Sequence, residues 1–156
     1  MSRMPHRRII NERTRDIWGT NVYYDSDECK IYAFFEDNLL SQNYLLMLNI
    51  SKRYPFRPPD TTVNNKNIFD FYASLFSSNS STFIKQQQQE LFTGKCLCCA
   101  SILCKNNWGP NMTIKSILDE FVEYICLKKR ILERFWLRSI LRINNIPIEI
   151  PILDYL

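Results

Sequence analysis

The chain has 156 residues, of which 46% are hydrophobic and 13% aromatic, enough for a single globular domain with its own core. Its formal net charge of +4 is mild and no nucleic-acid-binding motif accompanies it, so we expect no nucleic-acid partner. No stretch approaches the roughly 20 apolar residues of a membrane span, and the charged N-terminus lacks an apolar signal region. We therefore expect no membrane partner and an intracellular location in the cytoplasm, the nucleus or both.

The N-terminal third predicts a basic helix followed by antiparallel strands. Residues 7–18 form the expected helix, which Gly19 ends, with Ile9, Ile10, Ile17 and Trp18 available for packing. Strand-forming residues then fill 22–24, 30–35 and 44–50. The polar turns between them are too short for a parallel crossover, so these strands should form a meander.

A proline-rich loop follows the last of these strands. The run Tyr54-Pro-Phe-Arg-Pro-Pro59 cannot make an ordinary sheet ladder, because proline has no backbone N–H to donate. We expect a rigid loop at the surface, with an increased chance of a cis bond between Tyr54 and Pro55.

The next segment, about 72–92, predicts a polar insertion. It contains runs of serine and asparagine at 77–81 and of glutamine at 86–89, and it is too poor in apolar residues to build a core.

Four cysteines lie close together after this insertion: Cys96, Cys98, Cys99 and Cys104. The segment is apolar enough for a strand or an extended loop. Neighbouring thiols rarely satisfy disulfide geometry, so a reducing compartment fits. Three roles stay open for the thiols: small buried hydrophobes, zinc ligands, or a nucleophile beside the polar loop 105–107. Zinc is the weakest of these, because no second pair lies at zinc-finger spacing and the only histidine, His6, is remote.

A long helical pattern begins at Thr113, a good N-cap whose hydroxyl can accept the N–H of Ser116. The expected buried positions are Ile114, Ile117, Leu118, Phe121, Val122 and Ile125, and the expected solvent-facing ones are Lys115, Asp119, Glu120 and Glu123. Beyond Ile125 the pattern fits either one long helix or two. Prolines at 147 and 151 favour an extended tail over 146–156.

Two motifs in this order resemble the ubiquitin-conjugating enzyme family. Trp108-Gly-Pro-Asn-Met-Thr-Ile114 is similar to the segment that follows the family's active-site cysteine, and Tyr54–Pro59 is similar to its Y-P-F-x-P-P motif. The resemblance covers about 7–126. The family's His-Pro-Asn motif is absent, and 127–156 is divergent.

The resemblance implies a thiol that carries ubiquitin as a thioester. Alignment on Ile102-Leu103 and Trp108 places the nucleophile at Cys99, with Cys98 and Cys96 as alternates, and puts Ser101 at a gate position beside it. Because His-Pro-Asn is absent, we take Asn107 as the candidate donor to the oxyanion.

The resemblance also implies a docking surface for a ubiquitin ligase, formed by Phe56, Pro110, Arg7 and Arg8.

We therefore predict an α+β fold of the ubiquitin-conjugating type: a four-stranded antiparallel meander with an N-terminal helix and C-terminal helices, as one domain over 1–156. The expected function is a carrier of ubiquitin or a ubiquitin-like protein, with an activating enzyme and a ligase as partners and with no metal or other cofactor. The alternative is a catalytically inactive relative that binds ubiquitin or partner proteins.

Overall fold

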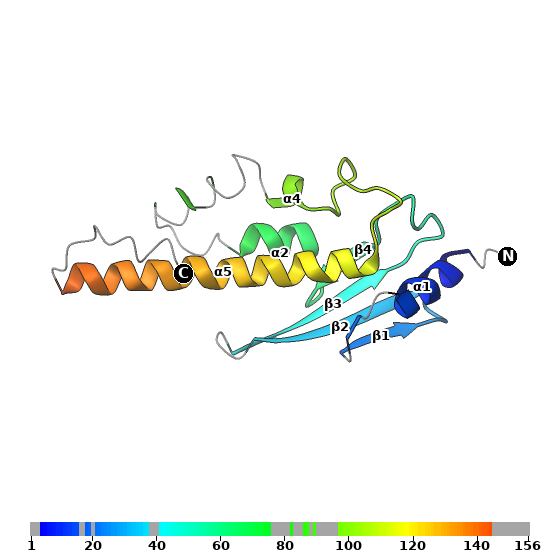
Figure 1. Ribbon diagram of the computed structural model, residues 1–156, viewed down its shortest axis with the longest axis horizontal. Coiled ribbons are helices and arrows are strands. Elements are labelled where there is room, and N and C mark those ends of the chain that lie inside the picture. The colour runs from blue at the N-terminus through cyan, green and yellow to red at the C-terminus, as the bar shows by residue number, and fades with distance from the viewer. Residues whose placement is uncertain are drawn as a thin grey trace.

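The computed structural model describes residues 4–15, 18–19, 21–37, 41–75, 82, 86–87, 89 and 97–144. Their fold is α+β, with an antiparallel sheet beside a long helix (Figure 1). The N-terminal helix α1 is Met4–Arg15, so it begins earlier than predicted. Of its two central isoleucines Ile9 is buried, whereas Ile10 is 46% exposed.

The sheet has five strands in the order of the sequence, β1-β2-β3-β4-β5, and all neighbours are antiparallel. The strands are β1 (Val22–Asp25), β2 (Lys30–Asp37), β3 (Gln42–Asn49), β4 (Asp60–Val63) and β5 (Lys66–Asn67). The expected meander is confirmed, but the predicted number of four strands is wrong. The extra strand, β5, has only two residues and follows a turn in which Asn64 and Asn65 have positive φ.

One face of the sheet forms the core, as period-2 alternation requires. Ile31 and Ala33 of β2 and Leu46 and Leu48 of β3 are fully buried. The aromatic ring of Phe121 from the long helix lies 4.9 Å from that of Phe35, centroid to centroid. The long helix therefore covers this face, which we call the inner face.

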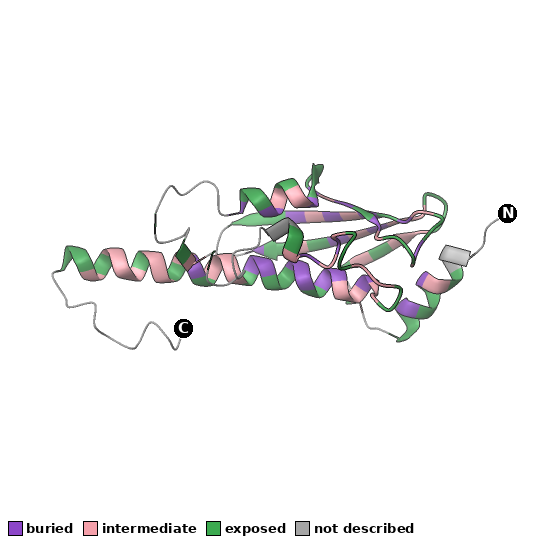
Figure 2. Cartoon of the chain, turned by 90° about the horizontal axis from the view of Figure 1, so that it is seen from above, coloured by how far each residue is buried: buried purple, intermediate pink, exposed green. Residues whose placement is uncertain are grey.

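The long helix, α5, spans Ile114–Ile143 without interruption, so one helix replaces the two that were also possible. Its start is confirmed: the Thr113 hydroxyl accepts from the N–H of Ser116, and the Ser116 side chain returns a bond to the Thr113 N–H. Figure 2 shows buried positions concentrated in the first half of α5, while the second half extends past the sheet.

Helix α2 spans Ile68–Ser74, so the start of the predicted polar insertion, 72–74, is helical. Asn67 caps it by accepting the N–H of Phe69; Tyr72 within it is fully buried, and Leu75 just after it is buried. The segment 72–75 is therefore part of the core. Most of 76–92, and the tail 146–156 with its predicted extended structure, lie outside the described residues.

Candidate functional site

Cys99 lies in a one-turn helix, α4 (Leu97–Ala100), and is exposed. The predicted strand or extended loop is therefore wrong for these four residues. Cys99 lines a groove of about 450 Å³ together with the loop residues Lys105 and Asn106. The opposite wall is formed by the segment 58–61 and by the start of α2. A nucleophilic cysteine needs an accessible thiol, and Cys99 is exposed in a groove beside the loop 105–107. Cys96 and the side chain of Cys98 lie outside the described residues.

The side chain of Asn107 holds the cysteine segment in place. Its Nδ2 donates to the backbone oxygen of Cys99 at 2.8 Å and to that of Ser101 at 2.9 Å. An amide nitrogen has two hydrogens, and both are used by these bonds. In this arrangement Asn107 positions the segment and has no hydrogen left for an oxyanion. Asn106, by contrast, is exposed and lines the groove.

Ser101, the predicted gate residue, is not among the residues that line the groove. It is fully buried, its Oγ donates to Oε1 of Glu120 at 2.6 Å, and it accepts the N–H of Leu103 at 3.1 Å. A gate residue has to face the groove, whereas this hydroxyl faces α5. The hydroxyl is held there by the carboxylate of Glu120, a residue predicted to face solvent.

Glu120 is buried and joins three parts of the fold. Besides Ser101, the N–H of Ile102 donates to it at 2.7 Å, and the hydroxyl of Tyr72 from α2 lies 3.4 Å from it. Burial raises the pKa of Glu120, and the three hydrogen bonds oppose that rise. A signal for this was available, since position 120 is three residues after Ile117 and four before Tyr124, both buried. The prediction for Val122 is wrong in the opposite sense, because this residue was expected to be buried and is 42% exposed.

The two proline-containing loops lie side by side. Nε1 of Trp108 donates to the backbone oxygen of Pro55 at 2.7 Å, across 53 residues of sequence. The Tyr54–Pro55 peptide bond is cis, as expected. Phe56 is 77% exposed and Pro110 is also exposed, so both present their side chains at the surface of these loops.

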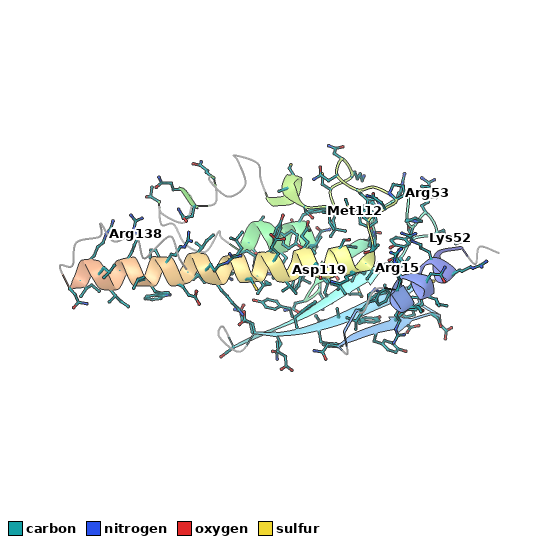
Figure 3. The ribbon with its side chains drawn as sticks, in the orientation of Figure 1. Arg15, Lys52, Arg53, Met112, Asp119 and Arg138 are labelled. Carbon is teal, nitrogen blue, oxygen red and sulfur yellow. The ribbon has the colours of Figure 1, made fainter. Side chains whose placement is uncertain are left out.

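The end of the molecule that carries these loops is also basic. Figure 3 shows Lys52, Arg53 and Met112 at the same end as α1 and Arg15. Arg7 of α1 is exposed as well. The predicted docking residues therefore lie within one region of the molecule. In this region an exposed aromatic residue lies among basic side chains.

Arg8 has an internal role that the sequence did not indicate. Its Nε bonds to the buried carboxylate of Glu12, and its Nη2 donates to the backbone oxygen of Pro110 at 3.3 Å. Glu12 is 1% exposed and also accepts from the hydroxyl of Tyr54 at 2.7 Å and from the N–H of Ile114 at 3.0 Å. Burial, with Glu12 as the next cause, raises the pKa of Tyr54. This cluster fastens α1 to the proline loop and to the first residue of α5.

The described residues contain neither a cluster of metal ligands nor a helix that could span a membrane. No three of their His, Cys, Asp and Glu side chains are grouped so that they could hold a metal ion. None of the described helices combines the length and the apolar composition needed to cross a bilayer.

Comparison of the chain with protein-family models, with curated proteins and with solved structures found no match in any of the three.

Proposed function

We propose that the chain is a carrier of ubiquitin or a ubiquitin-like protein, with Cys99 as the acceptor thiol. In this function the Cys99 thiolate attacks the acyl carbonyl of the modifier's C-terminus, held as a thioester on the activating enzyme. The activating enzyme's thiolate leaves, and a thioester to Cys99 remains. A lysine amine, or a ligase cysteine, then attacks this carbonyl and releases the Cys99 thiol.

The observation that carries the proposal is the exposed Cys99 in a groove beside the loop that leads to Trp108. The groove has a volume of about 450 Å³, and the basic residue Lys105 lines it together with Cys99. The contact of Trp108 with Pro55 joins the two motifs on which the resemblance rests. Neither motif alone would have required that contact.

The alternative function, an inactive relative that binds ubiquitin or partner proteins, has its own support. Ser101 is buried, and both amide hydrogens of Asn107 are used by backbone oxygens. Two of the three residues expected to act at the thioester, Ser101 and Asn107, therefore use their side chains for hydrogen bonds within the fold. A protein of this kind would keep the docking surface and lack the transfer activity.

Loading with the modifier separates the two functions. The full chain is incubated with ubiquitin, activating enzyme and ATP, and we expect a product one ubiquitin larger that reducing agent removes. Cys99→Ser should give an ester that resists reducing agent, and Cys99→Ala should give no product. Cys104→Ala is the matched control, because Cys104 lines the same groove and is half-buried.

Loading that persists in Cys99→Ala would assign the thiol to Cys98 or Cys96, which the corresponding single serine variants would identify. No loading of the parent chain with ubiquitin or with any ubiquitin-like protein and its activating enzyme would contradict the carrier function and leave the binding module.

A further inference from the structure

The face of the sheet opposite α5, the outer face, is aromatic and open to solvent. Tyr23 of β1 is opposite Tyr32 of β2, and Phe34 lies two residues further along β2 on the same face. Tyr23 is 61% exposed and Phe34 is 55% exposed. Met47 of β3, opposite Tyr32, continues the apolar surface and is half-buried. Tyrosine, phenylalanine and methionine are the residue types enriched in protein interfaces.

The second half of α5 has an open apolar surface of its own. Trp136, Ile140 and Ile143 are 63%, 52% and 80% exposed, and their spacing of four and three residues places them on one side of the helix. Large apolar side chains grouped in this way on an exposed helix are typical of helix-in-groove or helix-on-sheet contacts.

The two surfaces carry opposite charge. The hairpin Val22–Asp37 has five acidic side chains and one basic, a formal net charge of −4, and residues 127–143 have six basic and one acidic, a net charge of +5. Lys129 of the helix and the buried Asp37 of the hairpin form an ion pair within the chain, 2.9 Å apart. Setting that pair aside leaves −3 on the hairpin and +4 on the helix.

The helix cannot reach the outer face of its own sheet. The first half of α5 packs on the inner face through Phe121, and the helix continues unbroken to Ile143 in a direction that takes it past the sheet (Figure 1). A return to the outer face would require breaking the helix. A second copy of the chain has no such restriction.

We propose that the second half of α5 of one copy packs on the outer face of the sheet of another, around Tyr23, Tyr32 and Phe34. Two copies that exchange helices in this way form a closed dimer with two identical contacts. Two contacts double the buried area, which helps to reach the roughly 1,200 Å² of a stable interface. This inference does not depend on the proposed carrier function.

Sedimentation equilibrium of the full chain over a range of concentrations tests the proposal. We expect a monomer–dimer equilibrium whose dissociation constant rises with salt, because the charges at the rim of the contact are screened. Trp136→Ala and Phe34→Ala should each raise that constant about tenfold or more. The matched controls are Val122→Ala, an exposed apolar residue in the first half of α5, and Phe56→Ala, an exposed aromatic residue outside both surfaces; neither should change it.

A charge exchange identifies which surfaces meet. One variant carries Arg130→Glu and Arg142→Glu, and the other carries Asp27→Lys and Glu36→Lys; all four side chains are exposed. Each variant alone should dimerise more weakly than the parent, because both of its contacts join like charges. In an equimolar mixture the mixed dimer has one parental contact and one with both signs reversed, so it should form with an affinity close to that of the parent.

Circular dichroism and thermal unfolding establish that each variant is folded. A parent that is monomeric at all concentrations would overturn the proposal. So would an association that the helix variants weaken while Phe34→Ala and the hairpin variant leave it unchanged, since that pattern describes helix–helix pairing.

Discussion

The buried carboxylate of Glu120 determines how the segment after Cys99 is held, and Glu120→Ala tests this directly. The substitution leaves the N–H of Ile102 and the hydroxyls of Ser101 and Tyr72 without their acceptor. An unsatisfied buried donor costs roughly 1–3 kcal/mol, and the two hydroxyls can rotate to other partners while the N–H cannot. We expect the free energy of unfolding to fall by about 2–4 kcal/mol in urea denaturation.

Glu120→Gln is the matched control for this loss. Glutamine keeps the length of the side chain and an acceptor oxygen for the N–H of Ile102, and its amide can donate to the oxygen of Ser101. We expect its stability at neutral pH to lie within about 1 kcal/mol of the parent. Equal losses in the alanine and glutamine variants, or none in alanine, would refute the role assigned to the carboxylate.

The difference in stability between Glu120→Gln and the parent should depend on pH. Burial raises the pKa of Glu120 above its ordinary value of 4.5, so the folded chain binds this proton more tightly than the unfolded chain does. The contribution of Glu120 to stability is therefore largest below that value, falls as the pH rises through the folded pKa, and is constant above it. Relative to the parent, Glu120→Gln should gain stability as the pH rises above 4.5. A difference that does not change with pH would contradict the raised pKa.

Three more substitutions test the remaining assignments. Glu12→Ala should lower the free energy of unfolding by about 3–5 kcal/mol, since it leaves Arg8 and the hydroxyl of Tyr54 without their carboxylate, whereas loss of under 1 kcal/mol in urea denaturation would contradict the cluster. Asn107→Ala should slow both loading and discharge of the Cys99 thioester in single-turnover assays, because the amide positions the segment; slower discharge with normal loading would instead restore it as an oxyanion donor. Phe56→Ala should weaken ligase binding by about 2 kcal/mol in calorimetry with loading unchanged, and a joint loss of folding would show that Phe56 is structural.

The elements that the sequence predicted well are those with local signals. The strand over 30–35 follows from its β-branched and aromatic residues and the strand over 44–50 from an apolar run, and the start of α5 follows from Thr113 and Ser116, three residues apart. The Tyr54–Pro59 loop was recognisable because proline restricts its own backbone. In each case the residues that decide the structure are neighbours in the chain.

The two buried glutamates, which were missed, depend on distant partners. Glu12 is buried because Tyr54 and Ile114 bond to it across 42 and 102 residues, and Glu120 because Ser101 does so across 19. A glutamate is assigned to solvent because of its charge unless its partner is visible nearby, even where its helical position faces the core, as at Glu120. The one-turn helix at Cys99 is similar, since its four residues are too few to form a helix without tertiary support.

The two buried glutamates act at two different positions along α5, and each supports a different part of the proposed function. Glu12 bonds to the N–H of Ile114, at the start of the helix, and Glu120 lies six residues further on, about 9 Å along the axis. The first holds the loops of the predicted docking surface, and the second holds the segment that follows Cys99.

Mild substitutions should therefore separate the two activities: Glu12→Gln should weaken ligase binding more than loading, and Glu120→Gln should slow loading more than it weakens binding. Both are measured on folded protein, by calorimetry with a ligase domain and by single-turnover loading with ubiquitin. If both variants affected both activities equally, α5 would transmit the disturbance along its length, and the two ends could not be treated as independent supports.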